Sequence, residues 1–362
     1  MVRVIGHFDL DYFYAQVEEI EDPLLKGKPV VVCVFSGRTE DSGVVSTANY
    51  KAREFGIKSG MPIVLAKKKL ERIDSAFIKM QHEKYEDVSE EIMELIRTKV
   101  DVLEQTGIDE AFLDITKSSG GDYSAACTMA AGIKAAVKES HGLTASIGVG
   151  QSKVVAKMAS DSSKPDGLTV VTPESTNNFL SPLPIIRLYG VGPKTALALG
   201  TLGVTTVGDL ANLDPMQLDR VFGRKTAVYL HEAANGTDEE PVIEKQASTQ
   251  FSRIITLKKN TRDPDEAFNE LMPAIDDLHQ KLTSKGTSFR TLSAIGILSD
   301  LSVKSRSKTF GTPTDDHEVM KEGARALLRD LTTSIDKELR RVGIRLSDLS
   351  NTVDQTSLTQ FE

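Results

Sequence analysis

Apolar and polar residues follow two different periods over residues 2–170. Short apolar runs of strand length alternate with stretches in which apolar residues recur every three or four positions. This alternation predicts strands interleaved with helices. The predicted strands cover residues 2–8, 27–35, 77–81, 100–106, 110–116 and 143–150. The longer predicted helices cover residues 12–22, 82–100, 124–142 and 152–165. A short turn between strands 100–106 and 110–116 indicates a hairpin, so we expect a mixed sheet with helices packed on it.

The pattern changes near residue 170. Residues 182–213 contain helical segments around a Gly-x-Gly turn and show no strand pattern. Residues 235–248 are polar and have no period, as a linker would. From residue 249 onward, four predicted strands and two long predicted helices form a module of domain size. The expected fold class is therefore α+β with several domains.

Composition narrows the class of protein. The chain has 362 residues, 40% of them apolar, which is enough for two or more cores. We see no secretory leader, and no apolar run approaches the ~18 residues of a membrane span. Cys33 and Cys127 are far apart and form no metal-binding motif. We expect free thiols, a reducing compartment and a cytoplasmic protein that does not bind membranes.

Charge is unevenly distributed along the chain. The formal net charge is −8, which argues against a uniformly basic binder of nucleic acid. Residues 245–346, however, hold 18 Lys and Arg against 14 Asp and Glu. A basic C-terminal module that meets a polyanion is one explanation, and chance variation among solvated surfaces is the other.

Two adjacent carboxylates interrupt the apolar segment "GIDEAFLDIT", residues 107–116. Asp109 and Glu110 precede residues that a core would bury, and Asp9 lies at the end of the first predicted strand. If that strand lies beside the hairpin, the three carboxylates meet at one sheet edge, where divalent cations would relieve their repulsion. Expecting no histidine or thiol nearby, we predict Mg²⁺ or Mn²⁺. The alternative is that each acid is solvated at a turn.

Six motifs, taken in order, resemble the Y family of lesion-bypass DNA polymerases, and most closely its archaeal branch related to bacterial DNA polymerase IV. They are "HFDLDYFYAQVE", "GKPVVVCVFSGR", "STANYKAREFGIKSGMP", "GIDEAFLD", "SIGVGQSKVVAKMASDSSKPDGL" and "LYGVGPKTALALGTLGV". The resemblance covers essentially the whole chain. It implies a right hand with a mixed-sheet palm (1–17 and 79–171), fingers (18–78), a helix-hairpin-helix thumb (172–236), a linker (237–248), an α+β little finger (249–348) and a clamp-binding tail (349–362).

The resemblance also implies roles for residues of the first half of the chain. The catalytic metal ligands would be Asp9, Asp109 and Glu110, helped by the backbone carbonyl of Leu10, and would hold two Mg²⁺ ions, which Mn²⁺ can replace. The incoming nucleotide would meet Tyr12, Phe13, Tyr14, Tyr50, Arg53 and Lys164, with Tyr14 as the steric gate and Phe13 in the core. The roof over the base pair would comprise Val34, Val44, Ser46, Gly60 and Met61.

Three positions depart from the pattern of the family, and one of them is Leu10, which replaces a common Phe or Met and contributes mainly its backbone. Val44 is bulkier than the alanine that is common in relatives, and Gly107 replaces a usual serine before the Ile-Asp-Glu triplet. We expect these departures to affect lesion range and efficiency rather than the reaction.

The second half of the chain carries implied DNA contacts. They are Gly190, Gly192 and Lys194 in the thumb, and Lys304, Arg306, Lys308, Arg340, Arg341 and Arg345 in the little finger. Period-two spacing predicts that the first three little-finger residues share one sheet face. For the thumb residues, the alternative is a plain helical hairpin without a DNA contact. For the little-finger residues, the alternative is an exposed sheet edge that lysines protect from aggregation. In the tail, Gln355, Leu358 and Phe361 fit a sliding-clamp peptide, and a disordered end is the alternative.

The activity that the resemblance implies is template-directed addition of deoxynucleoside triphosphates to primer-template DNA past damaged bases. We expect low fidelity, no proofreading exonuclease and a monomer. Two rivals remain from the residues alone. A nucleotidyl cyclase or metal-dependent nuclease would explain the acids, and a DNA-binding scaffold would explain the basic module.

Overall fold

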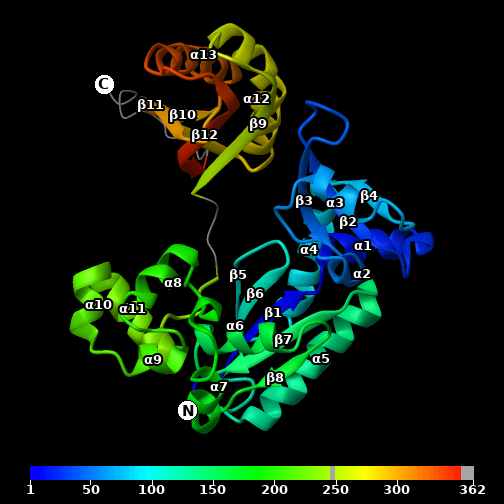
Figure 1. The fold of residues 1–362 in the computed structure, drawn as a ribbon, viewed down its shortest axis with the longest axis vertical. Helices are drawn as coiled ribbons and strands as arrows, with labels where there is room; N and C mark the ends of the chain where they lie inside the picture. The colour runs from blue at the N-terminus through cyan, green and yellow to red at the C-terminus, as the bar shows by residue number, and fades with distance from the viewer. Residues whose placement is uncertain (245–248, 352–362) are drawn as a thin grey trace, which may run out of the picture. The chain divides into compact units, whose positions relative to one another are not determined.

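The computed structural model describes residues 1–244 and 249–351. The chain divides into two compact units. The first comprises Met1–Val32, Ser46–Lys58 and Arg72–Lys245, and the second comprises Cys33–Val45, Ser59–Glu71 and the chain from Gln246 onward. Figure 1 shows their helices and strands.

A five-stranded sheet forms the centre of the first unit, with the strand order β5-β6-β1-β7-β8. Its strands are β1 (Ile5–Leu10), β5 (Val102–Gln105), β6 (Glu110–Asp114), β7 (Ala145–Gly150) and β8 (Leu168–Val170). β1 pairs antiparallel with both β6 and β7. β5 and β6 also pair antiparallel, so the predicted hairpin is confirmed. The sequence pattern did not predict β8, a three-residue strand that runs parallel to β7.

Helices cover both faces of this sheet. They are α1 (Phe13–Glu21), α4 (His82–Arg97), α5 (Tyr123–His141) and α6 (Lys153–Ser162). Successive residues of a strand point to opposite faces. Phe8 and Leu10 of β1 therefore join an apolar core that α4 and α5 complete. Ile5, His7 and Asp9 point to the other face, where Ile5 contacts Ala156 of α6.

Gly148 of β7 allows α6 to lie directly against the sheet. A Cβ atom at this position would come within 2.1 Å of the Ala156 carbonyl oxygen and 2.2 Å of the Ser160 nitrogen. Real Cβ atoms do not make such contacts, so the absence of a side chain is required for the helix to approach. The consequence is that side chains of α6 reach the face that carries His7 and Asp9.

Residues 172–236 form helices and contain no strand. The helices are α7 (Thr176–Leu180), α8 (Pro193–Gly200), α9 (Val207–Ala211), α10 (Pro215–Phe222) and α11 (Arg224–Asn235). Short 3-10 turns occupy Pro173–Ser175 and Ile185–Arg187, and a third lies at Pro23–Leu25. Leu199, Leu210 and Leu230 form an apolar core with Val155 of α6.

A small three-stranded sheet, β3-β2-β4, forms between α1 and α4 in the sequence. Its elements and the two short helices beside them are β2 (Val30–Phe35), β3 (Gly43–Ala48), α2 (Tyr50–Glu54), α3 (Ile63–Lys69) and β4 (Ala76–Lys79). Cys33 in β2 is buried and Cys127 in α5 is half-buried. Both are free, as predicted.

The C-terminal module is a four-stranded antiparallel sheet with two helices on one face. The strand order is β11-β10-β12-β9. The elements are β9 (Gln250–Thr261), α12 (Pro264–Ser284), β10 (Thr287–Leu298), β11 (Val303–Thr314), α13 (His317–Thr333) and β12 (Leu339–Asn351). Leu292, Ile344 and Leu346 pack with Leu278 of α12 and Leu328 of α13. Together with the first unit, this module confirms the predicted α+β multidomain class.

Part of the predicted linker is packed against the five-stranded sheet. Val242 is 7% exposed and lies in an apolar cluster with Ile5 and Phe112. The Ile243 amide donates a hydrogen bond to Glu104 Oε2 at 2.9 Å, and Arg97 Nε donates to Glu244 Oε1 at 2.9 Å. The polar composition of residues 235–248 concealed this docking, because a single buried valine supplies the apolar contact.

Replacing Gly148 with alanine tests the contact between α6 and the sheet. We expect Gly148→Ala to lower the free energy of unfolding by about 3 kcal/mol or more, because the methyl group overlaps backbone atoms of α6. Denaturant titration measures the change. Gly132→Ala in α5 is the matched control, because a Cβ there would meet open space. Its free energy of unfolding should rise by about 0.5–1 kcal/mol, because alanine is the better helix former. Equal stability of Gly148→Ala and the wild type would contradict the close contact.

Candidate active site

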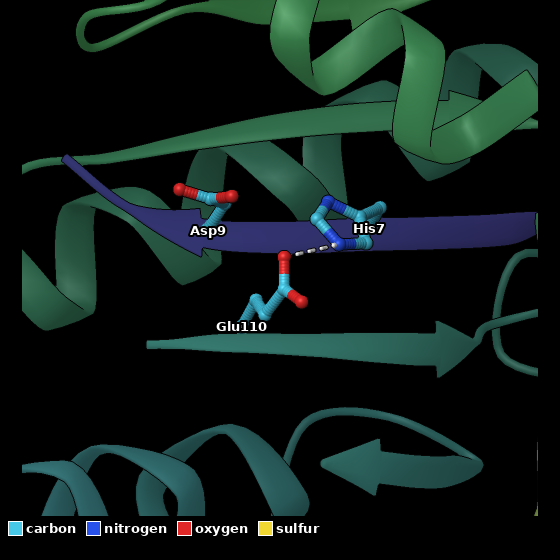
Figure 2. Close-up of side chains that lie close together, drawn as sticks. All are labelled: His7, Asp9 and Glu110. Carbon is cyan, nitrogen blue, oxygen red and sulfur yellow. Dashed lines mark ion pairs between the residues drawn. The ribbon is translucent and has the colours of Figure 1, made fainter. Parts of the chain in front are cut away.

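Asp9 and Glu110 lie opposite each other on paired strands. β1 and β6 are in antiparallel register with Asp9 facing Glu110, so both side chains point to the sheet face beneath α6. His7, two residues before Asp9, shares that face. One ligand atom from each of His7, Asp9 and Glu110 lies within 4.8 Å of the other two. Figure 2 shows the imidazole of His7 and the carboxylate of Glu110 pointing toward each other.

Asp109 lies next to this group, in the turn that precedes β6. Its backbone carbonyl accepts a hydrogen bond from the Leu10 amide at 2.8 Å, which fixes the turn to the end of β1. Burial raises the pKa of the Asp109 carboxyl to about 6, and the negative charges of Asp9 and Glu110 contribute. The predicted convergence of three acids therefore occurs in space, although the tightest cluster of possible ligand atoms contains His7 in place of Asp109.

The prediction that no histidine lies near the acids is wrong. His7 Nε2 is 3.5 Å from Glu110 Oε2, and His7 Nδ1 is 2.8 Å from Ser160 Oγ of α6. Burial lowers the pKa of the imidazole, which favours its neutral form. Both ring nitrogens thus have polar partners, and the ring orients the Glu110 carboxylate, as neighbours of metal ligands commonly do. Oxygen atoms remain the available donors, in keeping with the predicted Mg²⁺ or Mn²⁺.

Two lysines neutralise part of the acidic charge. Lys157 Nζ of α6 lies 2.8 Å from Glu110 Oε2 and 3.2 Å from Asp9 Oδ2. Lys164 Nζ lies 2.6 Å from Asp9 Oδ2 and 2.9 Å from Asp161 Oδ1. Burial alone would lower the pKa of each ammonium, but the surrounding carboxylates, Asp9 first, outweigh burial and raise it.

The balance of charge suits a divalent cation. Asp9, Asp109, Glu110 and Asp161 bring four carboxylates, whereas Lys157 and Lys164 bring two ammonium groups. Hydrogen bonding from His7, followed by Lys157, lowers the pKa of Glu110, so this acid is ionised. Asp109 has no such ion pair among the described contacts of the site, and burial, followed by the charges of Asp9 and Glu110, raises its pKa. The residues present therefore fit a metal that adds positive charge beside Asp109.

Two aromatic residues and an arginine form a contiguous group beside the start of α1. Tyr12 caps the N-terminus of α1 in the left-handed conformation, at φ 37°, which few non-glycine residues adopt. Its ring meets Tyr50 edge-on at 5.4 Å between centroids, and the Arg53 guanidinium lies 4.7 Å above the Tyr50 ring. Arg53 Nε also donates to the Ala48 carbonyl at 2.8 Å, so the planar group is held at its base.

Tyr14 and Phe13 occupy different environments on the first turn of α1. Phe13 is 2% exposed and belongs to the core beneath the sheet, as predicted. Tyr14 is half-buried and stacks on Tyr85 of α4 at 4.4 Å between ring centroids. Burial raises the pKa of the Tyr14 hydroxyl, and the charge of Asp109 adds to the rise. The hydroxyl of Tyr14 is therefore within reach of the electrostatic effect of Asp109.

An internal hydrogen-bond network holds the loop that carries Lys164. Asp11 is 1% exposed; its Oδ1 accepts from Ser146 Oγ at 2.8 Å and its Oδ2 accepts from the Asp166 amide at 2.8 Å. Ser146 Oγ in turn accepts from the Gly167 amide at 3.2 Å. Buried polar groups that are fully hydrogen-bonded fix local geometry. The loop after α6 is thereby attached to β1 and β7.

Comparison with known proteins identifies the arrangement. The model of the impB/mucB/samB family matches residues 8–161, the model of its C-terminal domain matches residues 248–358, and a DNA polymerase-iota thumb domain model matches residues 186–238. A DNA polymerase IV of Methanosarcina acetivorans is 43% identical over 367 residues and covers 100% of both chains. One of Nitrosopumilus maritimus is 40% identical and covers 99% of both chains.

Solved structures agree with the sequence relatives. A Y-family DNA polymerase chimera, Dbh-Dpo4(243-245)-Dbh, matches with a TM-score of 0.89 at 35% identity, covering 96% of this chain and 99% of that chain. An insertion ternary complex of Dbh DNA polymerase matches with a TM-score of 0.70 at 35% identity, over 96% and 99% of the two chains.

The chain belongs to the Y family of DNA polymerases. The resemblance seen in the sequence is confirmed, both for the family and for the branch of DNA polymerase IV relatives. None of the helices in the described part of this polymerase is long and apolar enough to cross a membrane.

The thumb segment of the polymerase contains the predicted glycine turn. Gly190 has φ +83°, and a Cβ there would lie 2.5 Å from the Tyr229 hydroxyl, so glycine is required for this contact. Gly192 caps the N-terminus of α8, and a Cβ on it would meet open space. Lys194 is exposed on the first turn of that helix. An open backbone at a helix N-terminus is compatible with an approaching phosphate.

The predicted roof residues of the polymerase lie in β2, in β3 and in the turn after α2. Val34 and Val44 are exposed by 45% and 44%, which is unusual for valine in a strand. The Gly60 amide donates to the Val45 carbonyl at 2.9 Å, and the Val45 amide donates to the Met61 carbonyl at 2.8 Å. This pairing holds the turn with Gly60 and Met61 against β3, whose next residue is Ser46.

The basic residues of the C-terminal module fall on two faces of its sheet. Lys304, Arg306 and Lys308 share one face, as predicted, because they pair with Gly296, Ala294 and Leu292 of β10. Those partners face α12 and α13, and Arg306 forms an ion pair with Asp330 of α13 at 3.0 Å.

The arginines of β12 do not extend that surface. Arg341 and Arg345 alternate with buried Val342 and Ile344, so they point to the face without helices. Strand β10 also separates β11 from β12, so the two basic strands are not adjacent in the sheet. Arg340 is exposed beside a register shift near Leu339. The predicted tail residues Gln355, Leu358 and Phe361 lie outside the described residues.

Sequence reasoning missed two residues of the acidic site. His7 lies two residues before Asp9 on one strand. The period of two along a strand would therefore have placed both side chains on the same face. Lys157 carried a weaker signal: it lies one helical turn after Lys153 and one before Asp161. That spacing places the three side chains on one face of the helix. Which surface of the protein this helix face packs against depends on long-range packing.

Proposed function

We propose that this Y-family DNA polymerase extends primers past damaged template bases by two-metal nucleotidyl transfer. Low fidelity and the lack of a proofreading exonuclease belong to the same proposal. The observation that carries it is the convergence of Asp9, Glu110 and Asp109 at the end of β1, with more negative charge than the two lysines balance.

Asp9, Asp109 and Glu110, with the backbone carbonyl of Leu10, would hold the two Mg²⁺ ions. When bound, such a pair activates the attacking hydroxyl and stabilises the charge on the leaving phosphate oxygens. His7 lies beside Glu110 and orients it, and α6 packs closely on this face of the sheet. Mn²⁺ would substitute, because the donors are oxygens.

Tyr50, Arg53 and Lys164 would bind the triphosphate of the incoming nucleotide. Arg53 offers a planar guanidinium that stacks on Tyr50, and planar donors suit phosphate oxygens. Lys164 offers a mobile charge beside Asp9. Tyr12 would form one wall of the pocket and Tyr14 would pack beneath the sugar, where a 2′-hydroxyl has no room.

Template tolerance would come from the roof residues, Val34, Val44, Ser46, Gly60 and Met61. Small and exposed side chains select weakly against distorted base pairs, since shape complementarity is what rejects them. Val44 adds bulk at this surface, so we propose that it narrows the range of bulky lesions that the enzyme accepts.

DNA would be held by parts of the chain outside the acidic site. We assign the palm to residues 1–17 and 79–171, the fingers to 18–78, the thumb to 172–236 and the little finger to 249–348. Gly190, Gly192 and Lys194 would contact a phosphate in the thumb, independently of sequence. In the little finger, we assign the main contact to the face with Arg341 and Arg345, because α12 and α13 cover the other. Binding of a sliding clamp by the tail, and a monomeric enzyme, complete the proposal.

Removing the acidic site tests the reaction. We expect Asp109→Asn with Glu110→Gln to reduce primer extension with Mg²⁺ by at least about a thousandfold, because two of the three proposed carboxylate ligands lose their charge. Single-turnover extension on undamaged and abasic templates measures the loss. Glu104→Gln, in β5 and away from the site, is the control for a lost buried acid. Extension that survives in the double variant would rule out the assigned ligands.

Replacing Tyr14 tests the selection of the sugar. Tyr14→Ala should raise the relative efficiency of ribonucleotide insertion by about tenfold or more, because the side chain beneath the sugar is removed. The ratio of kcat/KM for matched ribo- and deoxynucleotides measures it. Tyr12→Phe keeps the neighbouring ring and serves as the control. An unchanged ratio in Tyr14→Ala would remove the role of gate.

Replacing basic residues on each sheet face tests how the little finger meets DNA. Arg345→Ala and Arg341→Ala should weaken DNA binding and lower the slope of log K against log salt by about one each. Fluorescence anisotropy over a salt series measures both. Lys308→Ala, on the helix-covered face, should change the slope by much less. A larger effect of Lys308→Ala than of Arg345→Ala would assign the contact to the β11 face instead.

A further inference from the structure

The positive charge of Lys157 lies where it would repel a metal ion held by Asp9 and Glu110. Its ammonium contacts Glu110 Oε2 at 2.8 Å and Asp9 Oδ2 at 3.2 Å, and so connects two carboxylates from different strands. Only 14% of the side chain is exposed. A cation held between two buried acids stabilises them by the same electrostatic attraction that a divalent ion would supply.

A second acceptor for Lys157 is already in place. Asp161, one helical turn further along α6, lies 3.7 Å from Lys157 Nζ and is 46% exposed. Because both residues belong to α6, the ammonium can leave Asp9 and Glu110 and pair with Asp161 by side-chain rotation alone. No movement of the helix or of the sheet is needed.

We propose that Lys157 is an internal counter-cation of the metal-free site, and that divalent metal binding displaces its ammonium from Asp9 and Glu110 toward Asp161. Lys157 is thus a positioning residue that acts through the carboxylates. The proposal rests on the metal ligands proposed above. It follows that Lys157 stabilises the protein without metal and weakens the affinity for metal, two effects of opposite sign that come from one ion pair.

The decisive variant is Lys157→Met, which keeps an unbranched apolar chain out to the ε position and removes the charged Nζ. Without metal, Asp9 and Glu110 lose their shared cation, so the unfolding temperature in EDTA should fall. With Mn²⁺ and no DNA, the variant should bind the ion about tenfold more tightly than the wild type, because no ammonium competes. Saturating Mn²⁺ should restore most of the lost thermal stability.

Two further variants separate this role from ordinary packing. Lys153→Met removes an ammonium of the same helix that is even more buried than that of Lys157. Lys153 pairs with Glu104 at 2.7 Å and with Glu240 at 3.3 Å, and not with Asp9 or Glu110. This variant should lose stability in a way that Mn²⁺ does not restore, and its Mn²⁺ affinity should match the wild type. Lys157→Arg retains a positive charge and should keep the weaker affinity of the wild type.

Mn²⁺ binding by the full-length protein, followed through the paramagnetic resonance of the free ion, gives the affinities, and thermal unfolding with and without Mn²⁺ gives the stabilities. Equal or weaker Mn²⁺ affinity of Lys157→Met would overturn the proposal, as would a loss of stability that persists at saturating Mn²⁺. If the wild type extends primers in that case, the proposed function still stands. If Asp109→Asn with Glu110→Gln binds Mn²⁺ as tightly as the wild type, the metal ligands themselves are wrong.

Discussion

The contact between α6 and the five-stranded sheet is the constraint on which the acidic site depends. Carboxylates on a sheet face covered by a helix are costly unless positive charge reaches them. Gly148 removes the side chain that would keep α6 away, and Lys157 of α6 then reaches Asp9 and Glu110. The same contact brings Ser160 to His7. One glycine thus allows the packing that makes the buried acids tolerable.

The charges of the site are divided unequally among its acids. Glu110 contacts His7 and Lys157, and Asp9 forms ion pairs with Lys157 and Lys164. Burial, followed by the negative charges of Asp9 and Glu110, instead raises the pKa of Asp109 to about 6. The protein therefore pairs two of its acids with its own cations, whereas the third, Asp109, has no ion pair among the described contacts. This division explains how a fold can keep three carboxylates together before any metal binds.

The sequence supported the acidic site better than the DNA-binding surfaces, for a physical reason. Asp9 and Glu110 each sit at the end of a predicted strand, so the two acids meet once those strands are taken as neighbours, and the pairing of β1 with β6 confirms that assumption. The order of the C-terminal sheet could not be deduced in this way, because β10 lies between β11 and β12. Alternation correctly put Lys304 and Lys308 on one face, but it could not say which face the helices cover.

Long-range packing accounts for the remaining differences from the sequence-based prediction. Residues 238–244 have the composition of a linker, yet Val242 fills an apolar cluster with Ile5 and Phe112. Those two residues share the face of Asp9 and Glu110, as the register of β1 with β6 requires. Residues 238–244 and α6 therefore cover one sheet face together. Lys153 connects them, since it pairs with both Glu104 of β5 and Glu240 of that segment. The stripe of α6 that carries Lys153, Lys157 and Asp161 thus serves attachment at one end and the acidic site at the other.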